Sequence, residues 1–198
     1  MAIEVDDAGG AGEVENDARF VDVVRDRRVL RLGVLSALID VFDEPFLAFV
    51  VAYLTVARGH SAGAAATVAG LGLVGSAVAT MWASRSGRRT PPARVSGLLV
   101  AGVFAVLVAP HPLVAAAGAG AVGAGVNLGW ITIESRALTL RPGQAGATSA
   151  AVSMVAQGAI VVPLLVGAVA DRAGLVAAML LHLGVALTHA VVTRRAVR

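Results

Sequence analysis

The arginine residues of this chain lie on one side of a series of apolar segments. About 20 apolar residues span a bilayer core, and we predict six such spans: Leu30–Leu54, Ser61–Ala83, Val95–Ala109, Leu113–Leu138, Ala145–Ala170 and Leu175–Thr193. If the spans alternate in direction, fourteen of the sixteen arginines share one side of the membrane and only Arg58 and Arg172 lie on the other. The positive-inside rule then places both termini in the cytoplasm of a multi-pass cell-membrane protein.

Composition supports a membrane protein. The chain is 57% hydrophobic and 15% charged, whereas a soluble domain carries about 25% charge. The arginines lie between apolar runs and form no basic face interleaved with aromatic residues, so we expect no nucleic-acid partner. The absence of cysteine excludes disulfides and thiolate chemistry.

Three regions follow from this pattern. Residues 1–27 are acidic and glycine-containing, which predicts a disordered cytoplasmic tail, with helix expected only towards its end. Residues 28–195 form an all-α domain of six transmembrane helices, and residues 196–198 a cytoplasmic C-terminus. The third span is short, and we expect it to extend back over residues 92–94.

A short internal similarity predicts a repeat. Ala83–Gly87 and Ala170–Gly174 are similar segments separated by 87 residues, and each closes the second span of a three-span unit. An odd number of spans separates them, so they face opposite sides of the membrane, as in an inverted three-plus-three repeat. The same offset carries Asp40 onto Asn127.

The segment Thr80–Arg89 resembles the loop between the second and third helices of a half of the major facilitator superfamily, G-x-L-A-D-R-x-G-R-R. Thr80 stands at the leading glycine and Ser84 at the aspartate, as in the C-terminal half of the family. Leu140–Ala147 resembles the family's loop before the fifth helix of a half. Gly158, Pro163 and Gly167, leading into Ala170–Gly174, resemble the fifth helix and its outer turn.

The resemblance covers about residues 28–195 and implies one six-helix half of C-terminal type. It implies a secondary transporter that moves a small solute by alternating access and couples this movement to protons. An antiporter that exports its solute is one form of such a transporter. The family has twelve spans, so a second six-helix half is implied, either a homodimer partner or a separate chain. The alternative is a truncated or structural membrane subunit that does not transport.

Three acids and a proline interrupt the first span. Asp40 lies about 15 Å into it, and Asp43, Glu44 and Pro45 follow. Each charged acid costs at least about 2.5 kcal/mol at such a depth, and Pro45 removes a helix hydrogen bond, so we predict a kink. The three acids are candidates for ion coupling. Alternatively, they form the polar lining of a cavity or pair with an arginine, Arg31 or Arg136.

Other polar side chains are candidates for the transport path or for a gate. Asn127 and Gln157 lie near the middle of their spans, and Trp130 lies close by. All three are candidates for the substrate path. The alternative for Asn127 and Gln157 is a hydrogen bond that joins two helices. The alternative for Trp130 is a packing or interfacial anchor. Arg85, Arg88 and Arg89 are explained either by a cytoplasmic gate or by plain positive-inside topology. Glu134 lies near the cytoplasmic end of its span with Arg136 close by, which predicts a gate or a loop salt bridge rather than a midplane site.

The sequence favours no enzyme. Its glycine-rich runs lack the Lys-Ser/Thr of a phosphate-binding loop and lie within apolar segments. His182 and His189 are seven residues apart with no third ligand at metal spacing, so we interpret them as packing residues. We therefore expect neither a metal site nor a cofactor.

Overall fold

The computed structural model describes residues 20–87 and 90–196, and this part of the chain is helical with no β-strand. Four of its helices are long and apolar enough to cross a membrane: Ala62–Ser86, Pro112–Leu140, Pro142–Ala173 and Leu175–Arg195. A shorter apolar helix covers Pro92–Val108. These helices indicate a helical membrane protein.

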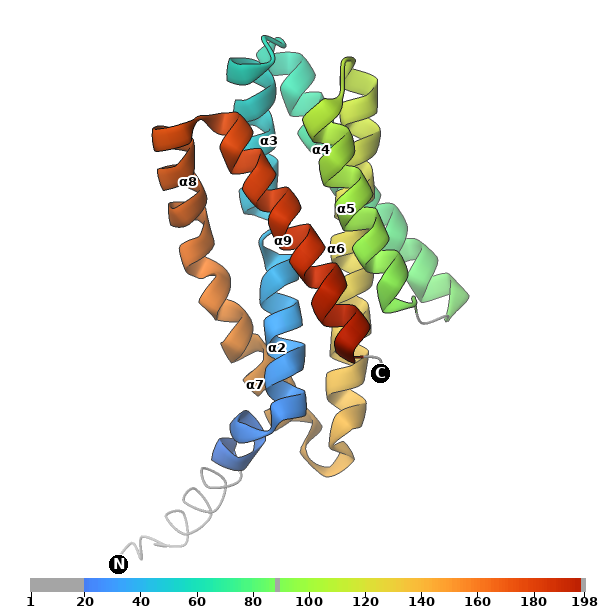
Figure 1. Cartoon of the computed structure of the whole chain (residues 1–198). Helices are drawn as coiled ribbons and strands as arrows, with labels where there is room; N and C mark the ends of the chain where they lie inside the picture. Colours follow the sequence, from blue (N-terminus) through green and yellow to red (C-terminus); the bar gives the residue numbers. More distant parts are fainter. Residues whose placement is uncertain (1–19, 88–89, 197–198) are drawn as a thin grey trace, which may run out of the picture.

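Successive segments run in alternating directions along the molecule (Figure 1). The first comprises α2 (Arg27–Asp40), α3 (Glu44–Ala52) and a π-helix, η1 (Tyr53–Ala57). The others are α4 (Ala62–Ser86), α5 (Pro92–Val108), α6 (Pro112–Leu140), the series η2 (Pro142–Gln144), α7 (Ala145–Ala156), η3 (Gln157–Val161) and α8 (Val162–Ala173), and finally α9 (Leu175–Ala196). The start of α2 and the α6–α7 connection lie towards the lower end in Figure 1.

Helix α6 packs against α4 and α5 through glycines. A Cβ atom on Gly123 would overlap the carbonyl group of Gly72, and one on Gly75 would overlap that of Gly120. Small residues allow such close backbone approach where lipid provides no hydrophobic drive for helices to associate. The Ser76 hydroxyl adds an interhelical hydrogen bond to the carbonyl of Gly123 at 3.0 Å.

The first segment is broken where the sequence predicts a kink. Helix α2 ends at Asp40, and α3 begins at Glu44 with Pro45 in its first turn. Proline has no backbone N–H and is tolerated at such a position. The residues between are joined by tight turns, in which the amide of Phe42 donates to the carbonyl of Ile39 at 2.8 Å. The predicted first span is therefore two helices rather than one.

Two expectations about helix boundaries can be compared with the structure. The short third helix begins at Pro92, so the expected extension over residues 92–94 is confirmed. Residues 20–25 are helical, where the sequence predicts helix towards the end of the acidic tail, and Val23 is fully buried.

Candidate functional site

An open cleft lies beside the break in the first segment. Its volume is about 460 Å³, and its polar lining consists of Asp40, Asp43, Trp130 and Gln157. Pro45 and Pro163 also line it. The structure therefore brings together two of the three predicted coupling acids and two of the three predicted path residues. The third acid, Glu44, begins α3, and its side chain lies outside the described part.

The indole of Trp130 fixes one carboxylate of this cleft. Its Nε1–H donates to Oδ1 of Asp40 at 2.8 Å, joining α6 to the end of α2. A hydrogen bond from an N–H group to a carboxylate is stronger than a hydrogen bond between neutral groups, so it holds the carboxylate in place. Trp130 is therefore a hydrogen-bonding partner of the candidate acid, a role that packing or interfacial anchoring alone does not describe.

Both interrupted segments of the described chain meet at the cleft. Asp40 and Asp43 flank the α2–α3 break, and Gln157 is the first residue of the 3-10 helix that separates α7 from α8. Helix α2 contacts this 3-10 helix directly. Interrupted helices carry free backbone groups, which are tolerated at membrane depth where they face protein or a wet cavity. The cleft supplies such a surface.

Asn127 lies away from the cleft. Its side-chain oxygen accepts a hydrogen bond from the Thr80 hydroxyl of α4 at 3.2 Å. This geometry matches the interhelical hydrogen bond that the sequence left open as an alternative to the substrate path.

The predicted gate residues do not form one cluster. Glu134 accepts a hydrogen bond from Ser149 of α7 at 2.6 Å, and within the described residues it forms no ion pair with Arg136. Arg136 is half-buried and lines a separate small pocket. Arg85 is exposed in the last turn of α4, and the remaining two gate candidates, Arg88 and Arg89, lie outside the described residues.

An ion pair that the sequence did not suggest ties the start of α2 to the α6–α7 connection. Asp26 caps α2 by accepting from the amide of Arg28 at 2.8 Å, and Arg141 donates to its other oxygen, also at 2.8 Å. The pKa of Asp26 is lowered below its usual 3.8, mainly by the hydrogen bond from the backbone amide of Arg28 and next by the Arg141 guanidinium. Residues 115 positions apart carry no local pattern that would reveal this contact.

No protein-family model, curated protein sequence or solved structure matches the chain. The function is therefore argued from the geometry of the cleft. Among the described residues, no group of three or more His, Asp or Glu side chains is arranged to hold a metal ion.

Proposed function

We propose that this chain is the six-helix unit of a secondary transporter that moves a small solute by alternating access and couples it to protons. The observation that carries the proposal is the position of Asp40 and Asp43 at a break between two helices, inside an open cleft. Transporters commonly place substrate and ion sites at discontinuous membrane helices.

The energetic cost of placing carboxylic acids within a membrane span supports a functional role for them. A carboxylate within a membrane span is expensive and is retained mainly where it faces a bundle interior or water and handles ions or protons. Asp40 is only partly buried and borders a cleft wide enough for water and a small solute. Its hydrogen bond to Trp130 leaves its second oxygen available to the cleft.

The pattern of helix contacts supports the inverted repeat and a major facilitator-like half. Helix α6 packs on α4 and α5, while the first segment packs on α7 and α9, and α5 packs on α9. Exchanging the first three segments for the last three in order reproduces these contacts, although the extensive α8–α9 contact has no comparable counterpart between α4 and α5. A two-fold axis in the membrane plane relates repeats in this way.

The arginine distribution supports an orientation with both termini in the cytoplasm of a cell-membrane protein. Transport by this architecture requires a second six-helix unit facing the cleft, and we propose a homodimer partner or a separately encoded half. The role of Arg85, Glu134 and Arg136 as a gate stays a prediction.

The test uses proteoliposomes that contain a trapped pH-sensitive dye and carry an imposed pH gradient. Amines, carboxylates and neutral sugars are added in turn, and the rate at which the gradient changes is measured. We expect at least one solute class to move protons through the wild-type chain. Asp40→Asn should lower this rate at least about ten-fold, whereas Asp171→Asn, an exposed acid distant in sequence, should leave it unchanged.

A second variant separates positioning from titration. Trp130→Phe removes one charge-assisted hydrogen bond, a loss of about 1.5 kcal/mol or roughly ten-fold in coupled flux. Trp82→Phe, at an exposed tryptophan that lines no part of the cleft, is the matched control. Proton movement unaffected by Asp40→Asn would remove this acid from coupling. A chain inert with every solute class, as a monomer and as an oligomer, would overturn a transporter formed by copies of this chain alone.

A further inference from the structure

An open groove runs along the contact between α5 and α9. The two helices contact each other and lie side by side (Figure 1), and the volume of the groove is about 470 Å³. Within the described part of the chain, it shares no lining residue with the acidic cleft, which is lined by α6 and the two interrupted segments. The groove is therefore a separate surface from the one that faces the proposed second unit.

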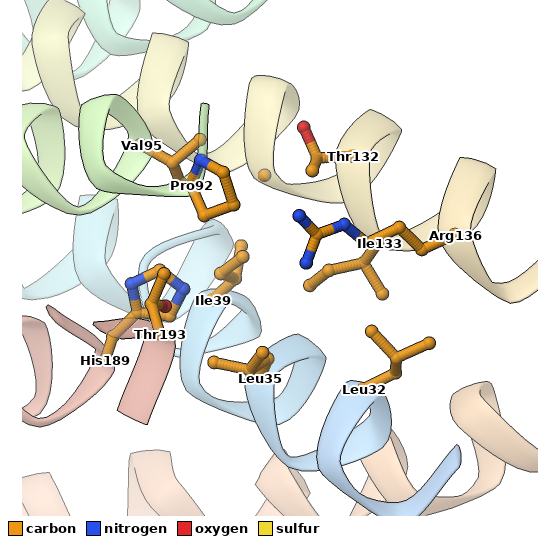
Figure 2. A pocket seen from close by; sticks show the side chains of 11 residues that line it. Leu32, Leu35, Ile39, Pro92, Val95, Thr132, Ile133, Arg136, His189 and Thr193 are labelled. Carbon is orange, nitrogen blue, oxygen red and sulfur yellow. The ribbon is translucent and has the colours of Figure 1, made fainter. Parts of the chain in front are cut away.

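A buried hydrogen bond holds the same two helices together on their inner side. His189 of α9 is buried, and its Nδ1 shares a 3.0 Å hydrogen bond with the hydroxyl of Ser96 in α5. Figure 2 shows this inner side, where His189 and Thr193 of α9 lie near Val95 of α5 around a small pocket. The groove lies on the outward side of a helix pair that is already fixed from within.

The lining of the groove is charged at one end and apolar along the rest of its length. Arg194, in the last turn of α9, is exposed at the charged end. Phe104 and Leu187 contribute apolar side chains that are about half exposed. Gly97 and Ala101 of α5 are small lining residues that leave space between the larger ones. Among the described residues, no acid lines the groove.

The groove spans the depth of one bilayer leaflet. Its lining extends over Ala93–Phe104 in α5 and Leu183–Arg194 in α9, which is about 16 Å along each helix. The hydrocarbon of one leaflet is about 15 Å thick. The two helices run in opposite directions, so Ala93 and Arg194 share one end of the groove. Arg194 is also at the end of a candidate membrane span, which places it at the level of the lipid headgroups.

We propose that this groove binds one anionic phospholipid. Its acyl chain lies along the apolar lining, and its phosphate contacts the guanidinium of Arg194. Arginines at the end of a membrane helix attract anionic headgroups, and a guanidinium can donate two parallel hydrogen bonds to one phosphate. The openness of the groove suits this ligand, because a lipid enters sideways from the bilayer and leaves the arginine in the hydrated headgroup layer.

The charge at the end of the groove disfavours a second copy of this chain as its occupant. Copies inserted in the same orientation and related by a two-fold axis present the same surface to each other. A contact through the groove would bring two Arg194 side chains to the same level of the membrane, where like charges repel. A lipid phosphate supplies the opposite charge at that level.

The test measures lipid binding and does not require transport. The protein is purified in detergent, stripped of lipid and titrated with dioleoyl phosphatidylglycerol or dioleoyl phosphatidylcholine, while native mass spectrometry counts bound lipids. We expect one tight phosphatidylglycerol site per chain, with at least about five-fold higher affinity than for phosphatidylcholine. Glycerol 1-phosphate and inorganic phosphate, at the same concentrations, should not compete because they lack the acyl chain.

Two variants separate the headgroup contact from the acyl-chain contact. Arg194→Gln should remove most of the preference for phosphatidylglycerol, whereas Arg27→Gln, at an exposed arginine of α2 outside the groove, should keep it. Gly97→Leu should weaken the binding of both lipids about ten-fold, the effect of burying roughly two fewer methylene groups. Gly70→Leu, at an exposed glycine of α4, is the matched control, since a Cβ atom at either glycine has no neighbour within 4 Å.

Thermal unfolding in the same detergent checks that each variant is folded, and the exposed position of Arg194 keeps the headgroup test independent of Gly97→Leu. Equal affinity of the wild type for the two lipids, or an unchanged preference in Arg194→Gln, would overturn the headgroup contact. Wild-type binding by Gly97→Leu would place the lipid outside the groove. A lipid-free dimer that Gly97→Leu dissociates would identify a second copy as the occupant and overturn the proposal.

Discussion

Arg58 and Arg172, the two arginines that break the charge asymmetry, each bond to carbonyls near a helix end. Arg58 donates to the carbonyl of Leu107 at 3.3 Å and also to that of Ala109, just after the end of α5. Arg172, in the last turn of α8, donates to the carbonyl of Ala168 one turn earlier, at 3.3 Å. The last carbonyls of a helix lack intrahelical donors and carry partial negative charge, so a cation near that end is stabilising. The exceptions thus have a local structural role.

At the same scale, the Asp26 carboxylate predicts a pH dependence. Its pKa is lowered in the folded state, so its contribution to stability is complete above 3.8 and is lost as pH falls through the lower, folded value. Asp26→Asn keeps a good helix cap and removes only the charge. At pH 7 it should reduce the unfolding free energy by up to about 1 kcal/mol.

Unfolding in detergent as a function of pH checks this. The difference between wild type and Asp26→Asn should stay constant down to about pH 5 and shrink below 3.8. Asp22→Asn, at an exposed acid in the preceding helical turns, is the control and should show no comparable difference. A gap between the two proteins that persists at the lowest pH would contradict the assignment.

At the scale of the elements, the bundle depends on glycines at particular helix contacts. Gly125 and Gly129 form the G-x-x-x-G pair of α6, and both face side chains of this same chain: Leu98 and Leu99 for the first, Ile39 and Val95 for the second. The pair therefore serves packing within the chain. Gly102 and Gly118 make a reciprocal backbone contact between α5 and α6.

We predict that Gly123→Ala destabilises the bundle. The added methyl group would overlap the carbonyl of Gly72, and backbone cannot move aside as a flexible side chain can. Overpacking of this kind costs about 1–3 kcal/mol, so Tm should fall by at least about 2 °C in a chain of this length.

Gly97→Ala is the matched control for this measurement. Gly97 is exposed in the interior of α5, and a Cβ atom there has no neighbour within 4 Å. Alanine has the higher helix propensity, so this variant should be neutral or slightly more stable. Equal thermal stability of Gly123→Ala and Gly97→Ala would show that the α4–α6 contact is looser than described.

At the scale of the whole molecule, the alternating direction of the segments predicts which connections share a side of the membrane. The chain contains no cysteine, so single cysteines can be introduced without background. Gly143→Cys lies between α6 and α7, and Pro110→Cys between α5 and α6; both positions are exposed. A membrane-impermeant maleimide should label Pro110→Cys in intact cells and Gly143→Cys only after permeabilisation.

The reverse labelling pattern would invert the proposed orientation while leaving the alternation intact. Labelling of both cysteines from one side would contradict the alternation itself. Protein level and membrane integrity are monitored with the cysteine-free parent chain, which should not be labelled at all.

The sequence by itself determined the helical membrane class, the break at Pro45 and the acids beside it. These features depend on local composition, since length, hydropathy and the missing proline N–H act within one segment. It also indicated that Gln157 and Asp40 are polar residues at unusual depth. It could not show that they line the same cleft, because they belong to helices that meet only after folding.

Only the tertiary structure decided which side chains pair. The Trp130–Asp40 hydrogen bond, the Asp26–Arg141 ion pair and the position of Asn127 against Thr80 all join residues at least 47 positions apart. Such contacts depend on helix rotation and on glycine-limited approach distances, neither of which a hydropathy pattern specifies. The same rotation brings the half-buried Arg136 to the edge of a small pocket that it shares with residues of α2, α5 and α9.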